Sequence, residues 1–280
     1  GDMVVWARAL SAPEIASDYS DPWQQLRGTG ALTAGSVSAN GTPGVTTIPL
    51  VASPSTGGTA PYSYQWQWSA YGANSWADVA GETSLTLAAT GLASGTPYDY
   101  RLKTTDSAGS PATVYTAAYS AQTLFPVDHA NVHLSPTNWY VAGSNPATNA
   151  VTVRGGSCLS FGFTGTSARL VLDMTNVAAP GNIVCAWSVD YGARTTGSPA
   201  ATVTLASGLS AGTHAALFWD AAQGSAANCW NVNGTYPDYC VNVKGIQLDV
   251  GATLAAGPSW PADKTLLVGD SITAGATSGP

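Results

Sequence analysis

The residues with the clearest chemical potential lie near the end of the chain, in the stretch KTLLVGDSIT (residues 264–273). The run 264–268, which ends in three apolar residues, predicts a β-strand, and Ser271 would open the helix that follows it. A serine at such a turn exposes its Oγ, and its backbone N–H points toward the place where an oxyanion develops. Gly269 and Gly275 permit a tight turn and close packing. This pattern predicts a nucleophilic serine at the end of a strand.

A serine nucleophile needs a base within hydrogen-bond reach. The three histidines, His129, His133 and His214, all precede the serine by more than fifty positions. Asp128, His129 and His133 could suggest a metal site, but they follow Pro126 in an irregular segment where i and i+4 residues do not meet. We therefore expect no metal and no cofactor. His214 enters a strand after a Gly-Thr turn and is expected to be structural.

The stretch 264–273 resembles the first sequence block of the SGNH (GDSL-type) hydrolases, which deacylate lipids, polysaccharides and other acyl esters. The resemblance implies that Ser271 is the nucleophile and the first oxyanion donor, and that Gly269 and Asp270 shape its turn. The family's remaining blocks supply an oxyanion Gly, an oxyanion Asn and an Asp-x-x-His base downstream of the serine, and the sequence has none of these after Ser271. We therefore expect a fragment of a longer protein, inactive by itself. The alternative is an accidental G-D-S-I in Gly- and Ser-rich sequence.

The elements before the serine are predicted to be strands. Runs such as SCLSFGFTGTSARLVLDMT (157–175) and YCVNVKGIQLDVGATL (239–254) are separated by glycine turns, which is typical of β-structure. With an F-x-G-T-S strand at 163–167 and an L-x-x-G-x-H turn at 209–214, residues 125–259 resemble the N-terminal jelly roll of carbohydrate esterase family two.

The four cysteines all lie in this region, at Cys158, Cys185, Cys229 and Cys240. Their spacing matches no zinc or redox motif. An even count in one β-rich region favours two disulfides and an oxidising compartment. We predict Cys229 with Cys240 and Cys158 with Cys185, the alternative being four buried free thiols. Trp230, Tyr236 and Tyr239 lie in the same 229–240 loop and are predicted either to contact polysaccharide or to pack the loop.

Two further modules are predicted upstream. YSYQWQWS (62–69) alternates strictly, and Tyr98 with Leu92 suits a tyrosine corner, in which the phenol closes a hydrogen bond across the loop between sheets. Residues 28–124 thus resemble a fibronectin type III or immunoglobulin-like sandwich, whose aromatic row is expected to form the core rather than a sugar platform. VVWARALSAPEIASDYSDPW (4–23) resembles the end of a laminin-G-like jelly roll, assigned to residues 1–27.

The predicted fold is therefore all-β: tandem β-sandwich and jelly-roll modules, with the first strand of an α/β SGNH domain at residues 260–280. Charged residues make up 9% of the chain, and the net charge is −7. The nine Lys and Arg are scattered, so nucleic-acid binding is not expected, and no apolar run approaches the ~20 residues of a membrane span.

We expect the stalk and glycan-positioning region of a polysaccharide O-acetyl esterase that is secreted or attached to a virion. Its partner would be a polysaccharide or glycan ester. The alternative is a structural or adhesive fibre protein, such as a phage tail fibre, which would be a candidate homo-oligomer.

Overall fold

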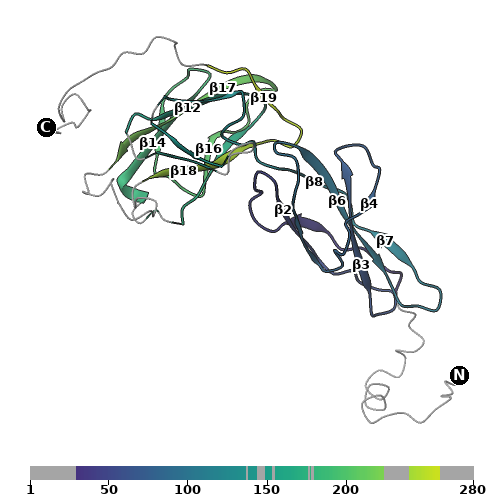
Figure 1. Ribbon diagram of the computed structural model, residues 1–280. Helices are drawn as coiled ribbons and strands as arrows, with labels where there is room; N and C mark the ends of the chain where they lie inside the picture. The colour runs from purple at the N-terminus through teal and green to yellow at the C-terminus, as the bar shows by residue number, and fades with distance from the viewer. Residues whose placement is uncertain are drawn as a thin grey trace, which may run out of the picture. The chain divides into compact units, whose positions relative to one another are not determined.

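The computed structural model describes residues 30–258, except 137, 144–148, 153–154, 176, 178–179 and 224–239. The described residues form strands joined by turns, with a single 3₁₀ turn at Pro180–Asn182 (η1) and no α-helix (Figure 1). The all-β prediction is confirmed for this part of the chain. The predicted laminin-G-like segment and the predicted SGNH strand lie outside the described residues.

The chain divides into two compact units. The first comprises residues 1–40, 50–87 and 99–119, and the second comprises residues 41–49, 88–98 and 120–280. The second unit therefore includes two loop regions from the first half of the sequence. The predicted boundaries at 27, 124 and 259 stay predictions.

Two antiparallel sheets are built from residues 37–122. One has the strand order β1-β2-β5, and the other has the order β4-β3-β6-β7, with β8 pairing with β6. Their bounds are β1 Val37–Ala39, β2 Ile48–Ala52, β3 Ser63–Ala70, β4 Ala77–Asp78, β5 Thr86–Ala89, β6 Pro97–Thr105, β7 Thr113–Tyr115 and β8 Tyr119–Gln122.

The alternation on β3 and β6 decides which side chains are buried. Trp66 is fully buried, and its indole Nε1 donates to the Ser84 carbonyl at 2.9 Å. Tyr100 and Leu102 on β6 are 1% exposed and also belong to the core. Trp68, at the end of the row on β3, is 40% exposed. Within the β3 row, the core expectation therefore holds for Trp66 but not for Trp68, while Tyr62 and Tyr64 are half-buried.

The hydrogen bond predicted for a tyrosine corner is present. The Ala93 N–H donates to the Tyr98 hydroxyl at 3.0 Å. The phenol therefore ties the start of β6 to the loop before it. Assignment of this sandwich to the fibronectin type III family stays a prediction.

Two larger antiparallel sheets form the remainder of the second unit. Their strand orders are β10-β11-β18-β13-β16 and β15-β14-β17-β12-β19, with β9 also pairing with β12. The bounds are β9 Val132–Leu134, β10 Tyr140–Ala142, β11 Asn149–Thr152, β12 Cys158–Gly165, β13 Ala168–Leu172, β14 Ile183–Val189, β15 Thr195–Gly197, β16 Thr202–Ala206, β17 Gly212–Gln223, β18 Val241–Leu248 and β19 Leu254–Ala255.

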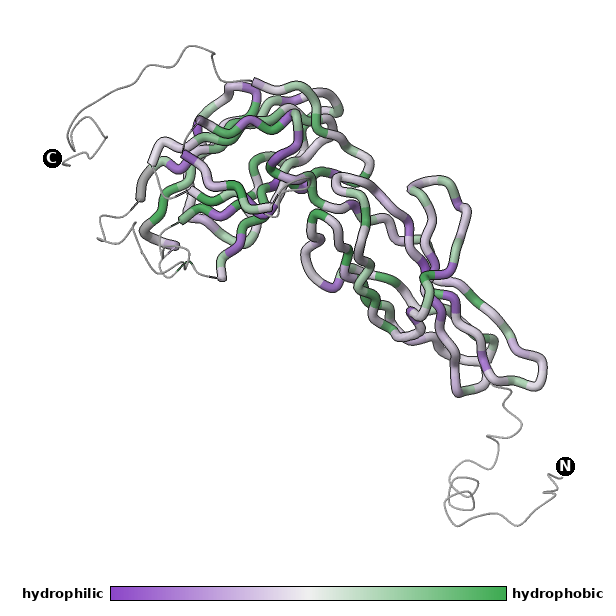
Figure 2. Tube along the Cα trace, in the orientation of Figure 1, coloured by the Kyte–Doolittle hydropathy of each residue, from purple (hydrophilic) through white to green (hydrophobic). Residues whose placement is uncertain are grey.

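The core of the second unit lies between these two sheets. Phe161, Phe163 and Phe218 from one sheet and Leu170 and Ile246 from the other are all fully buried. Hydrophobic stretches run along these strands, and more polar residues fill the turns between them (Figure 2). Two apolar sheet faces packed together are what jelly rolls and sandwiches require.

The F-x-G-T-S sequence forms the turn between β12 and β13. Asp249 accepts hydrogen bonds from the backbone N–H and the hydroxyl groups of both Thr166 and Ser167. Burial alone would raise the pKa of Asp249, but these hydrogen bonds from Ser167 and Thr166 lower it. The motif has a structural role here: it fixes the turn to the segment after β18.

The predicted Cys158–Cys185 disulfide is wrong. Both residues are free thiols, on strands that lie on opposite sides of β17, where Cys158 faces Trp219 and Cys185 faces Asp220. Two strand spacings separate their Cα atoms by about 10 Å, whereas a disulfide needs less than about 7 Å. Burial raises the pKa of Cys185 to about 12, with a further contribution from the Asp220 charge, so this thiol is unreactive.

No disulfide forms among the described residues. The second predicted pair joins Cys240, which is buried beside β18, to Cys229. Cys229 lies outside the described residues, so that pairing stays a prediction.

Candidate functional site

Most of the residues predicted to carry function fall outside the described part of the chain. The proposed nucleophile Ser271, its turn residues Gly269 and Asp270, and the predicted glycan contacts Trp230, Tyr236 and Tyr239 all belong to this group. The described residues instead show a hollow that composition and spacing did not predict.

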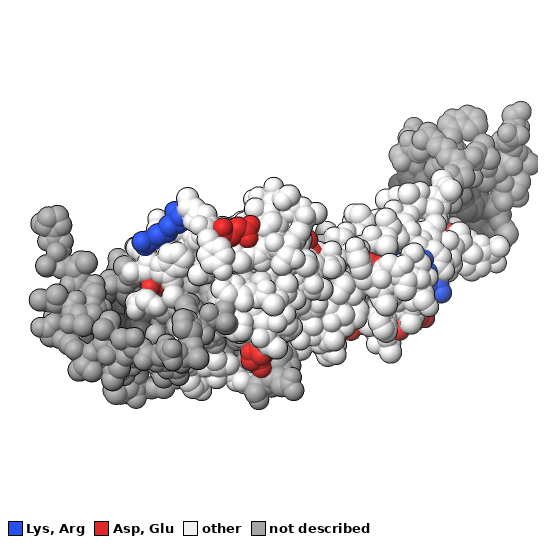
Figure 3. All heavy atoms as spheres, turned by 90° about the horizontal axis from the view of Figure 1, so that it is seen from above, with Lys and Arg blue, Asp and Glu red and all other residues white. Residues whose placement is uncertain are grey.

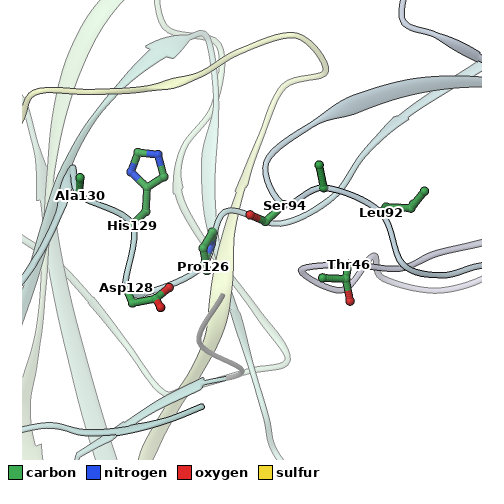
Figure 4. A pocket seen from close by; sticks show the side chains of 8 residues that line it. Thr46, Leu92, Ser94, Pro126, Asp128, His129 and Ala130 are labelled. Carbon is green, nitrogen blue, oxygen red and sulfur yellow. The ribbon is translucent and has the colours of Figure 1, made fainter. Parts of the chain in front are cut away.

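The hollow lies in the second unit and has a volume of about 500 Å³, within the range of small-ligand sites. Three separate segments meet there (Figure 4). It is lined by Thr46, Leu92, Ala93, Ser94, Pro126, Asp128, His129 and Ala130.

Gln122 holds together two loops near the hollow, one containing Gly95 and the other containing Gly251 and Ala252. Its side chain is 7% exposed, and its Nε2 donates to the carbonyls of Gly95 and Ala252, both at 3.0 Å. Its Oε1 accepts the Gly251 N–H at 2.8 Å. One amide thus satisfies three backbone groups, which orders the loop that carries Ser94.

The segment 125–129 is held to β18 at its first residue and is closed by a hydrogen bond within its own turn. Phe125 pairs with Ile246 through two backbone hydrogen bonds of 2.9 Å, and the His129 N–H donates to the Pro126 carbonyl at 3.2 Å. The Phe125 ring meets the imidazole of His129 edge-on, with ring centroids 6.0 Å apart. These contacts set the direction in which the His129 ring projects.

The geometry of His129 argues against a catalytic triad or a metal site. Its Nδ1 accepts the Asn131 N–H at 3.1 Å, so the neutral ring carries its proton on Nε2. The side chains of Asp128 and His129 project in different directions from the turn (Figure 4). No hydrogen bond joins Ser94 to His129 in the described structure, and no three His, Cys, Asp or Glu residues gather there as metal ligands.

The groups that line this hollow suit a hydroxyl-rich molecule. It offers the Thr46 and Ser94 hydroxyls, which both donate and accept, the Asp128 carboxylate, and the imidazole of His129. Leu92 and Pro126 add small apolar surfaces. Alternating donors, acceptors and apolar patches match the surface of a sugar ring better than that of a charged ion.

His214 takes part in a second polar arrangement, at the turn between β14 and β15. Its Nδ1 lies 2.7 Å from Asp190 Oδ2, and its Nε2 lies 2.9 Å from the Ser210 carbonyl oxygen. Asp190 also accepts the Ala215 N–H at 2.9 Å. Asp190 and Tyr191 both have positive φ angles, 52° and 55°, and Tyr191 is 72% exposed. The expectation that His214 is structural agrees with these bonds, because both ring nitrogens are engaged by the protein.

Few charges interrupt the surface. In the face shown in Figure 3, acidic and basic atoms form small, separate groups among uncharged residues. No helix in the described part of the chain has the length and hydrophobicity needed to cross a membrane.

No protein-family model and no curated protein matches this chain. Among solved structures, it is similar to a family two carbohydrate esterase from Cellvibrio japonicus, with 18% identity and a TM-score of 0.40 over 52% of this chain and 38% of that one. A family two carbohydrate esterase from Clostridium thermocellum in complex with cellohexaose is 24% identical, with a TM-score of 0.31 over 43% of this chain and 32% of that one.

A structure described among carbohydrate-binding modules of the β-sandwich superfamily is 12% identical, with a TM-score of 0.29 over 78% of this chain and 98% of that one. The chain spans only about a third of the length of the esterases. These likenesses are weak and concern the fold alone.

Proposed function

We propose that this chain is the accessory region of a polysaccharide O-acetyl esterase that is secreted or attached to a virion surface. In this proposal the β-modules form a stalk and present the glycan, and Ser271 supplies the nucleophile. The GDSIT sequence supports the reaction type, because it combines a predicted strand with a serine at the start of a helix.

The observation that carries the proposal is the contact of segment 254–258 with β12, shortly before Ser271 in the sequence. The segment 254–258 lies against β12, where the Ser160 hydroxyl donates to the Pro258 carbonyl at 2.8 Å. Gly162 and Gly257 pack so closely that a Cβ on Gly257 would lie 2.1 Å from the Gly162 nitrogen. The second unit therefore fixes the chain thirteen positions before Ser271. Such a chain spans at most about 45 Å, which limits how far the serine can lie from the sheet.

The proposed reaction follows from the role assigned to Ser271. Ser271 Oγ attacks the acetyl carbonyl, a histidine outside this sequence takes its proton, and the Ser271 N–H with other donors holds the oxyanion. The ester C–O bond then breaks, and the histidine gives its proton to the departing sugar oxygen, which leaves an acetyl-serine. Water hydrolyses this acyl-enzyme, releasing acetate and restoring the Ser271 hydroxyl. The described hollow would bind sugar units of the same polysaccharide through hydroxyl contacts to Thr46, Ser94 and His129.

Acetate release from acetylated xylan tests this proposal. The chain should be compared with a version extended by about 200 residues of its reading frame, the size of a catalytic domain, and with the Ser271→Ala variant of both. We expect release by the extended protein only, reduced at least about 10³-fold by Ser271→Ala.

Two results would contradict the proposal. Absence of Ser271-dependent release from the extended protein would favour the structural or adhesive fibre. Ser271-dependent release by the 280-residue chain alone would mean that the base is one of the chain's own three histidines.

A further inference from the structure

The outward face of one sheet in the first unit carries a polar and aromatic row that crosses four strands. Asp78 on β4 lies opposite Gln67 on β3, and Tyr115 on β7 lies opposite Lys103 on β6. Arg101 shares the face of Lys103, because side chains two residues apart on a strand point the same way. We call Gln67, Trp76, Asp78, Arg101, Lys103 and Tyr115 the β6 outer row.

A chain of hydrogen bonds orients Arg101 within this row. Gln67 Nε2 donates to Asp78 Oδ1 at 2.7 Å, and this contact sets the amide so that its Oε1 accepts from Arg101 Nε at 2.8 Å. Of the five guanidinium N–H donors, only the one on Nε has a partner within the described residues. The two Nη groups remain available to a ligand.

Two aromatic rings hold the guanidinium of Arg101 between them. Its central carbon lies 4.2 Å from the ring centroid of Trp76 and 4.2 Å from that of Tyr115. Stacking covers the faces of the guanidinium and leaves its edge for in-plane hydrogen bonds. Tyr115 is 44% exposed, so part of its own surface can also contact a ligand.

The charge distribution indicates what this row would bind. The protein has a net charge of −7, yet both cationic residues in the described part of the first unit, Arg101 and Lys103, lie two positions apart on this one face. Asp99, the neighbouring acid on the same face of β6, is 5% exposed and accepts the Gly72 N–H at 2.7 Å. It is thus turned into the protein, and Asp78 is bound to Gln67.

We propose that the β6 outer row binds an acidic polysaccharide through its uronate units. The carboxylate of a uronate accepts two parallel hydrogen bonds from the Arg101 edge and pairs with Lys103. The apolar face of a sugar ring packs on Tyr115, and ring hydroxyls reach the free oxygen of Asp78. This inference does not depend on the proposed esterase function, because it concerns the first unit alone.

Calorimetric titration of the full 280-residue chain tests this inference. The probes are an oligogalacturonate, a neutral cello-oligosaccharide of equal length, and polyglutamate, which has carboxylates but no sugar rings. We expect saturable binding of the oligogalacturonate, with the neutral glycan and polyglutamate bound at least tenfold more weakly. Equal binding of all three, or no binding of the oligogalacturonate, would overturn the inference.

Variants then locate the site. Arg101→Gln should weaken oligogalacturonate binding at least tenfold, and Lys103→Gln and Tyr115→Ala several-fold each. Lys244→Gln, which removes an exposed cation on β18 in the second unit, is the matched control and should change nothing. If Arg101→Gln fails to fold, Lys103→Gln and Tyr115→Ala still decide the question. Unchanged affinity in the row variants would show that the stacked arginine only stabilises the sheet.

Discussion

At the scale of single residues, the pair formed by His214 and Asp190 gives the second unit a pH-dependent contact. Both imidazole nitrogens face acceptors, the Asp190 carboxylate and the Ser210 carbonyl, and these two hydrogen bonds raise the pKa of His214. The Ala215 N–H and then His214 lower the pKa of Asp190. Each group is therefore favoured in its charged form when the protein is folded.

The sign of the pH effect follows from these two directions. A raised histidine pKa stabilises the fold below the unfolded value of about 6.5, and this stabilisation is lost as pH rises through the folded pKa. A lowered aspartate pKa stabilises the fold above about 3.9, and this is lost as pH falls through the folded pKa. The pair thus contributes most between about pH 4 and pH 6.5.

We predict that His214→Gln lowers the melting temperature more at pH 5.5 than at pH 8.5. The loss should stay below about 1 kcal/mol, because the Asp190 side chain is 49% exposed. Thermal unfolding followed by circular dichroism measures it. In an Asp190→Asn background, the drop in melting temperature caused by His214→Gln should depend much less on pH. An equal loss at both pH values in the original background would contradict the assignment.

At the scale of elements, the contact of segment 254–258 with β12 depends on two glycines. A Cβ on Gly162 would lie 2.4 Å from the Ala256 carbonyl oxygen, and one on Gly257 would meet the backbone of Phe161 and Gly162. Backbone atoms cannot move aside as a flexible side chain would.

We therefore predict that Gly257→Ala releases segment 254–258 from the sheet. Hydrogen exchange of this segment should rise at least tenfold, while exchange in the core strands changes little. Gly109→Ala is the control, since nothing lies within 4 Å of its Cβ position. Protection that stays the same in Gly257→Ala would mean that other contacts hold the segment.

The sequence predicted where strands occur better than it predicted which strands pair with each other. Strict alternation identified the strand within 62–69, and glycine turns identified strands within 157–175. The spacing of Tyr98 from Leu92 predicted a hydrogen bond of the phenol to the preceding loop, which is made with Ala93. Local sequence patterns do not predict the order of the strands in a sheet. β17 begins 27 residues after Cys185, yet it lies between the strands of Cys158 and Cys185 and keeps the two thiols apart.

The candidate sites were less predictable for a related reason. Thr46, Ser94 and His129 come from segments more than thirty residues apart, and no local pattern shows that they line one hollow. The β6 outer row likewise needs the β3–β6 and β6–β7 pairings before its members can be recognised. Ser271 had a local motif, but it lies outside the described residues.

At the scale of the whole molecule, we propose that this chain positions a glycan. Its second unit would then have two roles: Pro258 is held on β12 thirteen positions before Ser271, and the hollow lined by Ser94 and His129 is proposed to contact sugars. A neutral glycan tests binding in the hollow separately from binding at the β6 outer row, which is proposed to bind acidic glycans.

The most direct measurement is calorimetric titration of the full chain with a neutral acetylated xylo-oligosaccharide. We predict saturable binding that Ser94→Ala combined with His129→Phe weakens about tenfold, the loss expected from two hydrogen bonds of about 0.7 kcal/mol each. Thr213→Val, an exposed change on β17 away from the hollow, should leave the affinity unchanged. Absence of binding, or binding that the hollow variants do not weaken, would contradict the account.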